Sequence, residues 1–238
     1  MILLALDTTD ARGSLAVLRD DEVLQAIPHD TPEDYSSWIL PAAERALRAS
    51  ALKMQDVEIY SVAAGPGSFT GLRVGLTSVK AWSEVYGGKI AAISRLEAIA
   101  SQASGREPFV AAFVDAQREQ VFGGVFRRER EATALQLLRE ELVVSPQGFL
   151  DWVSEIAHDA GVAWISMDPE KLTNEKAWLE RAVTGATIQE SPHILAPIIG
   201  KIGLQRAKEG RLLDALALDA QYVRRSDAEI FWKGHAAR

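Results

Sequence analysis

A pattern of strand, aspartate, polar turn and strand opens this chain and returns in its middle, and this repetition constrains the fold more than any other feature. The first copy runs from 2 to 19 and the second from 109 to 127, with Asp7 and Asp115, 108 residues apart, at equivalent places. Any β-hairpin with a polar turn shares part of this match. A duplicated unit of meander and helix is nevertheless what a two-lobed, ribonuclease-H-like (actin-like ATPase) α/β fold requires, with mixed sheets flanked by helices.

Alternation of apolar and turn residues predicts the elements of each copy. A polar linker at 104–108 places the lobe boundary near 105, which gives a ribonuclease-H-like lobe at 1–105 and a C-terminal lobe with a tail at 106–238. The remainder of the chain is less legible than its first half. The predicted strands are 2–6, 14–18, 23–27, 57–64, 89–93, 109–115, 120–127 and 162–167, and the predicted helices are 32–49, 72–86, 95–103, 146–157 and 194–209.

Composition narrows the function classes. The chain has 238 residues, of which 47% are hydrophobic, enough for a full core. It has no cysteine, which excludes disulfides and thiolate metal sites and fits a reducing cytoplasm. Neither a signal peptide nor an apolar run of about 18 residues is recognisable, so we expect no membrane span. A net charge of −7 disfavours tight direct binding of nucleic acid, whose affinity comes mostly from cations.

The most unusual stretch is a glycine-rich string between a predicted strand and a predicted helix. Backbone amides at a helix N-terminus can hold an anion, but the spacing of a phosphate-binding loop is missing. A tight strand-to-helix connection with Ser68 or Thr70 capping the helix explains the glycines equally well, and the residues alone favour it. The string consists of Gly65, Pro66, Gly67, Ser68, Phe69, Thr70, Gly71, Leu72 and Arg73.

Other catalytic signals are weak. Asp7 and Asp115 could face one cleft and hold Mg²⁺ beside phosphates, but each could equally cap its own turn, and the residues favour the second interpretation. The four histidines form no pair with the spacing of zinc ligands, and Ser68 does not lie in a G-x-S-x-G motif. The sequence therefore nominates no catalytic, cofactor-binding or metal-binding residue.

Two predicted helices, 35–49 and 72–86, carry apolar residues on more than one face. A helix on its own sheet needs one apolar stripe, so the excess predicts contact with a partner, although deep burial within the chain fits the periodicity equally well. Charge substitutions at Leu76 or Val79 are then expected to abolish pairing without unfolding the chain. The predicted partner-interface residues are Tyr35, Trp38, Ile39, Ala42, Leu72, Gly75, Leu76, Val79 and Trp82.

Four segments together resemble the TsaB (YeaZ) family, whose members act in tRNA threonylcarbamoyladenosine biosynthesis and belong to the actin-like, M22 glycoprotease-like superfamily. The glycine-rich string is the most specific of them. Departures are Tyr35, where the family has a histidine, and Ala220, where it has a proline; the H-x-x-x-H pair of an M22 peptidase is absent. The matching segments are 4–9 with 14–17, 64–75, 114–122 and 221–224.

The resemblance implies a cytoplasmic, non-catalytic subunit that activates TsaD, a related catalytic subunit carrying metal and nucleotide (ATP or ADP). TsaE, an ATPase, joins that assembly, and tRNA is reached only through the complex. The family's first two helices contact TsaD or a second copy of the same chain, so a homodimer competes with the heterodimer. The alternative from the residues is an actin-like ATPase or sugar kinase that uses Asp7, Asp115 and the 65–71 loop, and more distantly an M22-type peptidase.

Overall fold

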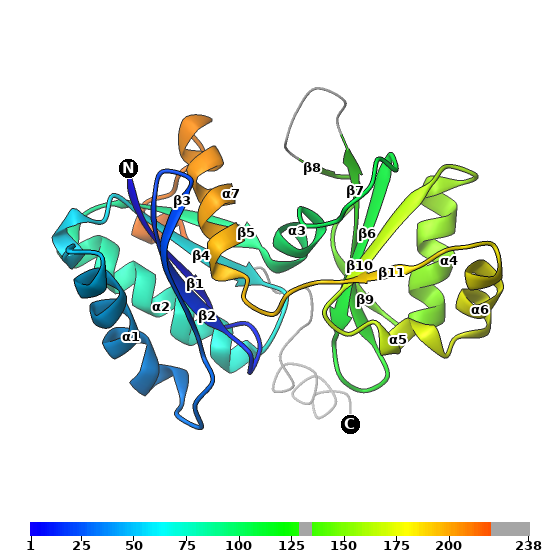
Figure 1. Ribbon diagram of the computed structural model, residues 1–238, viewed down its shortest axis with the longest axis horizontal. Helices are drawn as coiled ribbons and strands as arrows, with labels where there is room; N and C mark the ends of the chain where they lie inside the picture. Colours follow the sequence, from blue (N-terminus) through cyan, green and yellow to red (C-terminus); the bar gives the residue numbers. More distant parts are fainter. Residues whose placement is uncertain (129–134, 220–238) are drawn as a thin grey trace, which may run out of the picture.

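The computed structural model describes residues 1–128 and 135–219, which form two β-sheets with helices between and outside them (Figure 1). The strands are β1 Ile2–Asp7, β2 Ser14–Arg19, β3 Glu22–Pro28, β4 Ile59–Gly65, β5 Lys89–Ser94, β6 Phe109–Asp115, β7 Val121–Arg128, β8 Leu135–Leu137, β9 Leu142–Val144, β10 Val162–Ser166 and β11 Ile188–Glu190. The helices are α1 Tyr35–Ala49, α2 Phe69–Tyr86, α3 Arg95–Ala100, α4 Pro146–Ala157, α5 Glu170–Thr173, α6 Lys176–Val183 and α7 Ala196–Lys208, with 3₁₀ turns η1 Met54–Asp56 and η2 Ala215–Ala217.

The two sheets repeat one topology, which confirms the predicted duplicated fold. The first has the strand order β3-β2-β1-β4-β5, in which β1 pairs antiparallel with β2 and parallel with β4. The second has the order β11-β10-β6-β7-β8, in which β6 pairs antiparallel with β7 and parallel with β10. Thus β6 takes the place of β1. Asp7 and Asp115 end these two central strands, as the sequence comparison predicted.

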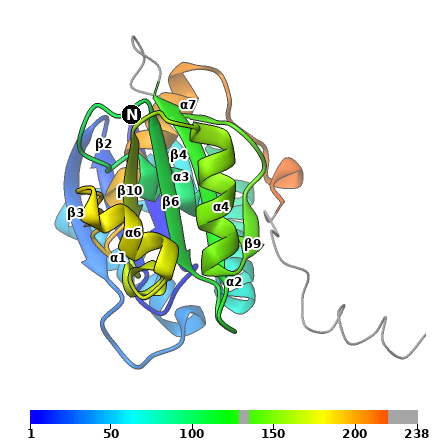
Figure 2. The ribbon, with the colours of Figure 1, turned by 90° about the vertical axis from the view of Figure 1, so that its right-hand side faces the viewer.

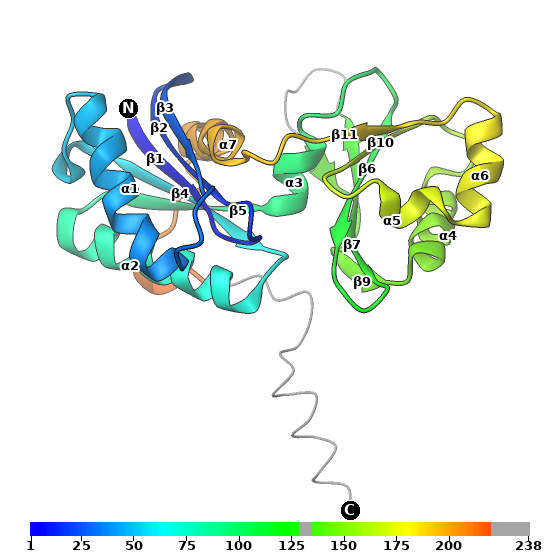
Figure 3. The same cartoon turned by 60° about the horizontal axis from the view of Figure 1, so that its bottom comes forward.

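Three apolar cores hold the layers together. Helices α1 and α2 cover the outer face of the first sheet, and α4 and α6 cover the outer face of the second (Figures 1 and 3). Between the sheets lie α3 and α7, whose apolar side chains join residues of both sheets into one cluster. Figure 2 views the second sheet with α4 and α6 in front. The lobes therefore share their central core.

Helix α7 belongs by its contacts to the first sheet, against β1, β2 and β4, although it follows residue 106, where the sequence analysis began the second lobe. Gly200 permits this packing because a Cβ there would lie 2.4 Å from Leu18 Cδ1. The lobe limits themselves stay a prediction. The short elements β8, β9, α5, α6 and β11 were not predicted, and the matching segment at 221–224 and Ala220 lie outside the described residues.

None of the helices in the described part of the chain combines the length and apolar character needed to cross a lipid bilayer.

Candidate functional site

The glycine-rich string joins β4 to α2, and the structure confirms the capped connection. Ser68 is the N-cap of α2, and its Oγ accepts a hydrogen bond of 3.3 Å from the amide of Gly71. This bond satisfies one of the amides that a helix N-terminus leaves without a partner. The helix begins at Phe69, three residues before the predicted start at Leu72, because the capping residue lies inside the string.

The β1–β2 turn, residues 8–13, packs directly on this connection. The Ser68 amide donates a hydrogen bond of 2.7 Å to Thr9 O, and Thr8 Oγ1 donates one of 2.7 Å to Gly71 O. A Cβ at Gly71 would lie 1.9 Å from Thr8 O, and one at Gly67 would lie 2.3 Å from Thr9 O. Such distances are far below van der Waals contact. The glycines are therefore required for the close approach of two backbone segments.

This packing limits what the connection can bind. An anion at the N-terminus of α2 would need free amides, yet those of Ser68 and Gly71 are directed at oxygens of the chain itself. The geometry is that of an internally satisfied contact between β1 and α2.

Each of the two strand-end aspartates caps its own turn. Asp7 Oδ1 accepts hydrogen bonds from the amide and hydroxyl of Thr9, at 2.9 and 2.6 Å. Asp115 Oδ1 accepts one of 2.8 Å from the amide of Gln117, and Asp115 Oδ2 lies 3.0 Å from Lys171 Nζ. The turn-capping interpretation is confirmed for both. Within residues 1–128 and 135–219, no three side chains of His, Asp or Glu are grouped as metal ligands.

A charged network that the sequence analysis missed lies beside these turns. Arg12 Nη2 is 3.0 Å from Asp10 Oδ2 and 2.9 Å from Asp168 Oδ1. Arg12 therefore joins the β1–β2 turn to the segment that follows β10. Arg95, at the start of α3, lies 2.5 Å from Asp10 Oδ2 and is 3% exposed. Nothing in the local sequence marks these residues, because 156 positions separate Arg12 from Asp168.

The network shifts the pKa values of Asp10 and Arg12. Burial opposes the charged form of Asp10, but the charge of Arg95 and hydrogen bonds from Arg12 and Arg95 outweigh it and hold the pKa of Asp10 well below its usual range. The hydrogen bond to Asp10 raises the pKa of Arg12, and that to Asp168 adds to it. Burial raises the pKa of the Tyr35 hydroxyl to about 12. That hydroxyl accepts a hydrogen bond from the Gly13 amide, at 2.8 Å.

The predicted partner-interface residues lie mostly in the core, which is the alternative of deep burial within the chain. Eight of the nine are buried in the chain itself, and Tyr35 is half-buried. Leu76 and Val79 are 6% and 1% exposed, because they pack α2 onto the first sheet. Burial at both positions argues that a charge there destabilises the chain itself, so the effect of these substitutions on pairing stays a prediction. The buried residues are Trp38, Ile39, Ala42, Leu72, Gly75, Leu76, Val79 and Trp82.

The outer surface of the same two helices carries other apolar side chains. Leu40 of α1 is 48% exposed, and Val85 and Tyr86 of α2 are 72% and 39% exposed. A recess of about 500 Å³ lies at the C-terminal ends of the two helices, beside η1. It is lined by Glu44, Leu47, Arg48, Ala51, Leu52, Lys53, Met54, Gln55 and Tyr86.

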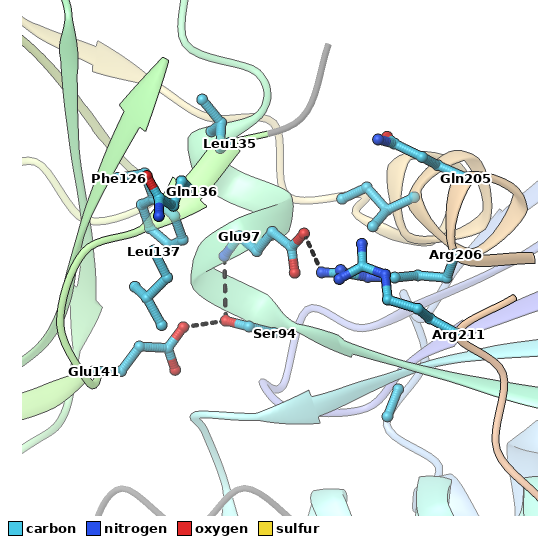
Figure 4. A pocket seen from close by; sticks show the side chains of 12 residues that line it. Ser94, Glu97, Phe126, Leu135, Gln136, Leu137, Glu141, Gln205, Arg206 and Arg211 are labelled. Carbon is cyan, nitrogen blue, oxygen red and sulfur yellow. Dashed lines mark hydrogen bonds and ion pairs between the residues drawn. The ribbon is translucent and has the colours of Figure 1, made fainter. Parts of the chain in front are cut away.

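A second cavity, of about 480 Å³, lies between β5, α3 and α7 on one side and β7 and β8 on the other (Figure 4). Ser94, the N-cap of α3, donates a hydrogen bond to Glu141 Oε1, and Glu97 Oε1 pairs with Arg206 Nη2 at 2.6 Å. Burial raises the pKa of Glu141 to about 7, and the charge of Glu97 adds to the effect although the hydrogen bond from Ser94 opposes it. The contact between Ser94 and Glu141 connects the two lobes, and the pair of Glu97 and Arg206 connects α3 to α7.

Comparison with known proteins identifies the family. The family model of "TsaD: tRNA N6-adenosine threonylcarbamoyltransferase" matches residues 21–162. The tRNA threonylcarbamoyladenosine biosynthesis protein TsaB of Bacillus subtilis is 28% identical, with 98% of each chain covered. The chain belongs to the TsaB (YeaZ) family, which is related to TsaD. The resemblance stated from the motifs is thereby confirmed.

Two solved structures place the TsaB family chain among known folds. YeaZ from Pseudomonas aeruginosa superposes with a TM-score of 0.71 at 20% identity, covering 93% of this chain and 99% of that one. An activator of 2-hydroxyisocaproyl-CoA dehydratase from Clostridium difficile, solved with bound ADPNP, gives a TM-score of 0.51 at 10% identity, covering 89% and 97%. Both likenesses concern the fold. They confirm the predicted actin-like architecture.

Proposed function

We propose that this chain is a non-catalytic subunit of the assembly that makes N6-threonylcarbamoyladenosine in tRNA, and that it binds and activates TsaD. The TsaB proteins of Bacillus subtilis and Escherichia coli are named for the biosynthesis of this nucleoside, and both align with the chain over nearly their whole length. In the proposed assembly TsaE is a further subunit. Metal and ATP or ADP are held by the partner subunits, and tRNA is bound only through the complex.

The observation that carries the non-catalytic role is the contact between the β1–β2 turn and the β4–α2 connection. Thr9 O accepts the hydrogen bond from the Ser68 amide, and Ser68 Oγ accepts that from the Gly71 amide, so these two amides are not directed at a nucleotide phosphate. Removal of this contact would require the two segments to separate, because the glycines bring their backbones together. A non-catalytic subunit that assists a related enzyme can keep the fold that both share and does not need a phosphate-binding site at this connection.

The proposed docking surface for TsaD is the outer face of α1 and α2. Leu40, Val85 and Tyr86 are exposed there, and the recess beside η1 could receive a side chain of the partner. Its lining combines the charged Glu44, Arg48 and Lys53 with apolar side chains, a mixture that suits a protein interface. A second copy of this chain would compete for the same face.

The test is to mix the purified chain with TsaD of its own organism and follow the species by light scattering, with ATP-dependent tRNA modification assayed in parallel. A stable one-to-one complex with activated TsaD supports the proposal. Magnesium-dependent ATP turnover or peptide hydrolysis by the chain alone, without a complex, would instead favour the ATPase, kinase or peptidase alternatives.

A further inference from the structure

One arginine bridges the two lobes. Arg12 lies in the β1–β2 turn of the first lobe, and its Nη2 pairs with Asp168, which follows β10 of the second lobe. Asp168 Oδ2 in turn accepts a hydrogen bond of 2.9 Å from the Asp115 amide, at the start of the β6–β7 turn. Arg12 thus ties the equivalent hairpin turns of the two repeats to each other.

The first-lobe end of this connection is anchored in the interior. Asp10 Oδ2 receives both Arg12 and the buried Arg95, and Arg95 Nη2 also lies 3.5 Å from Met167 Sδ, next to Asp168. Because Arg95 is fixed by burial, it holds Asp10 in place, and Asp10 orients Arg12. Charge-assisted hydrogen bonds of this kind are stronger than neutral ones.

We propose that the ion pairs of Arg12 with Asp10 and Asp168 hold the β1–β2 and β6–β7 turns at one fixed separation. We call this connection the interlobe strap. Without the guanidinium, Asp10 keeps its pair with Arg95, but Asp168 loses its cation from the first lobe, and with it the attraction between the two turns. The apolar core around α3 remains as the joint about which the lobes move. Loss of the strap therefore lets the two hairpin turns move apart.

The absence of cysteine from the sequence allows a direct distance measurement. Cysteines replace the exposed Ser36 in α1 and Asn174 after α5, and the distance between attached spin labels is measured by pulsed electron paramagnetic resonance. The variant Arg12→Gln removes the charge and keeps most of the side-chain length. The control Arg139→Gln breaks an exposed pair with Glu155 within the second lobe.

We expect a single narrow interlobe distance in the parent and in Arg139→Gln, and a longer, broader distribution in Arg12→Gln. Asp168→Asn removes the same pair from the other lobe and should give the same shift, whereas Arg12→Lys should shift less. Circular dichroism establishes that each variant is folded. Distributions in Arg12→Gln and Asp168→Asn that match the parent would overturn the proposal, whether or not the chain binds TsaD.

Discussion

Thr8 Oγ1 donates a 2.7 Å hydrogen bond to the carbonyl oxygen of Gly71, although 63 positions separate the two residues. The contact exists because Gly71 has no side chain. We expect Gly71→Ala to lower the free energy of unfolding by about 3 kcal/mol, since its Cβ would lie 1.9 Å from Thr8 O and one backbone segment would have to move. Urea unfolding monitored by tryptophan fluorescence measures the change.

The control for this prediction is Gly161→Ala, where the new Cβ would have its nearest neighbour at an ordinary 3.4 Å. That substitution should change the free energy of unfolding by less than about 1 kcal/mol. Equal effects of the two substitutions would show that the approach of Thr8 to Gly71 is not a stabilising feature.

Arg95 is buried beside Asp10, and its removal takes away the buried one of the two cations that pair with that carboxylate. Arg95→Met should therefore lower the free energy of unfolding by about 4 kcal/mol at neutral pH. Because Arg12 also pairs with Asp10, part of the loss is compensated, and the double variant with Asp10→Asn should be more stable than the single one. Guanidinium unfolding of the three chains tests the order.

The same ion pair predicts acid sensitivity with a definite sign. The pKa of Asp10 is lower in the folded chain than its usual value of 3.8, so the unfolded chain binds the proton more readily. This stabilisation is fully present above 3.8 and is lost as the pH falls below it. Asp10→Asn should flatten the acid limb of a stability–pH curve, whereas Asp159→Asn, at an exposed position, should leave its shape unchanged.

Glu141 gives the free energy of unfolding the opposite dependence on pH. Burial raises its pKa to about 7 from an ordinary 4.5, so the folded chain retains the proton longer than the unfolded chain does. Stability should fall as the pH rises from about 4.5 to about 7 and then level off. Glu141→Gln should remove this slope and stabilise the chain by up to about 3 kcal/mol at pH 8. Urea unfolding at pH 5 and pH 8 measures both effects, and a slope that persists in Glu141→Gln contradicts the assignment.

The proposed docking surface predicts that exposed and buried positions of α2 behave differently. Val85→Asp should leave the unfolding midpoint nearly unchanged and weaken TsaD binding at least about tenfold, because a charge is placed in an apolar contact. Leu76→Asp should unfold the chain, since it buries a charge in the core. Val183→Asp in α6, on the other lobe and 89% exposed, serves as the matched control for binding. Unchanged affinity in Val85→Asp would remove that residue from the surface.

The regular part of the fold was predictable because its signals are local. Alternating apolar residues and turn residues predicted the meander β1–β3, and the helical periodicity predicted α1, α2, α4 and α7. The repeat of strand, aspartate and turn predicted that β6 would take the place of β1. The segment from 130 to 189 was less legible, because β8, β9, α5 and β11 are three or four residues long and offer too few positions for a periodic signal.

The sequence by itself determined the family, the duplicated architecture and the capped β4–α2 connection, since each is written in contiguous residues such as the string from Gly65 to Arg73. The tertiary structure decided which apolar faces are buried: Leu76 and Val85 share one helix, and only packing on the first sheet tells them apart. It also decided the pairing of Arg12 with Asp168. Periodicity shows which residues of a helix share a face, but it does not show what packs against that face. Residues far apart in the sequence come into contact only when the chain is folded.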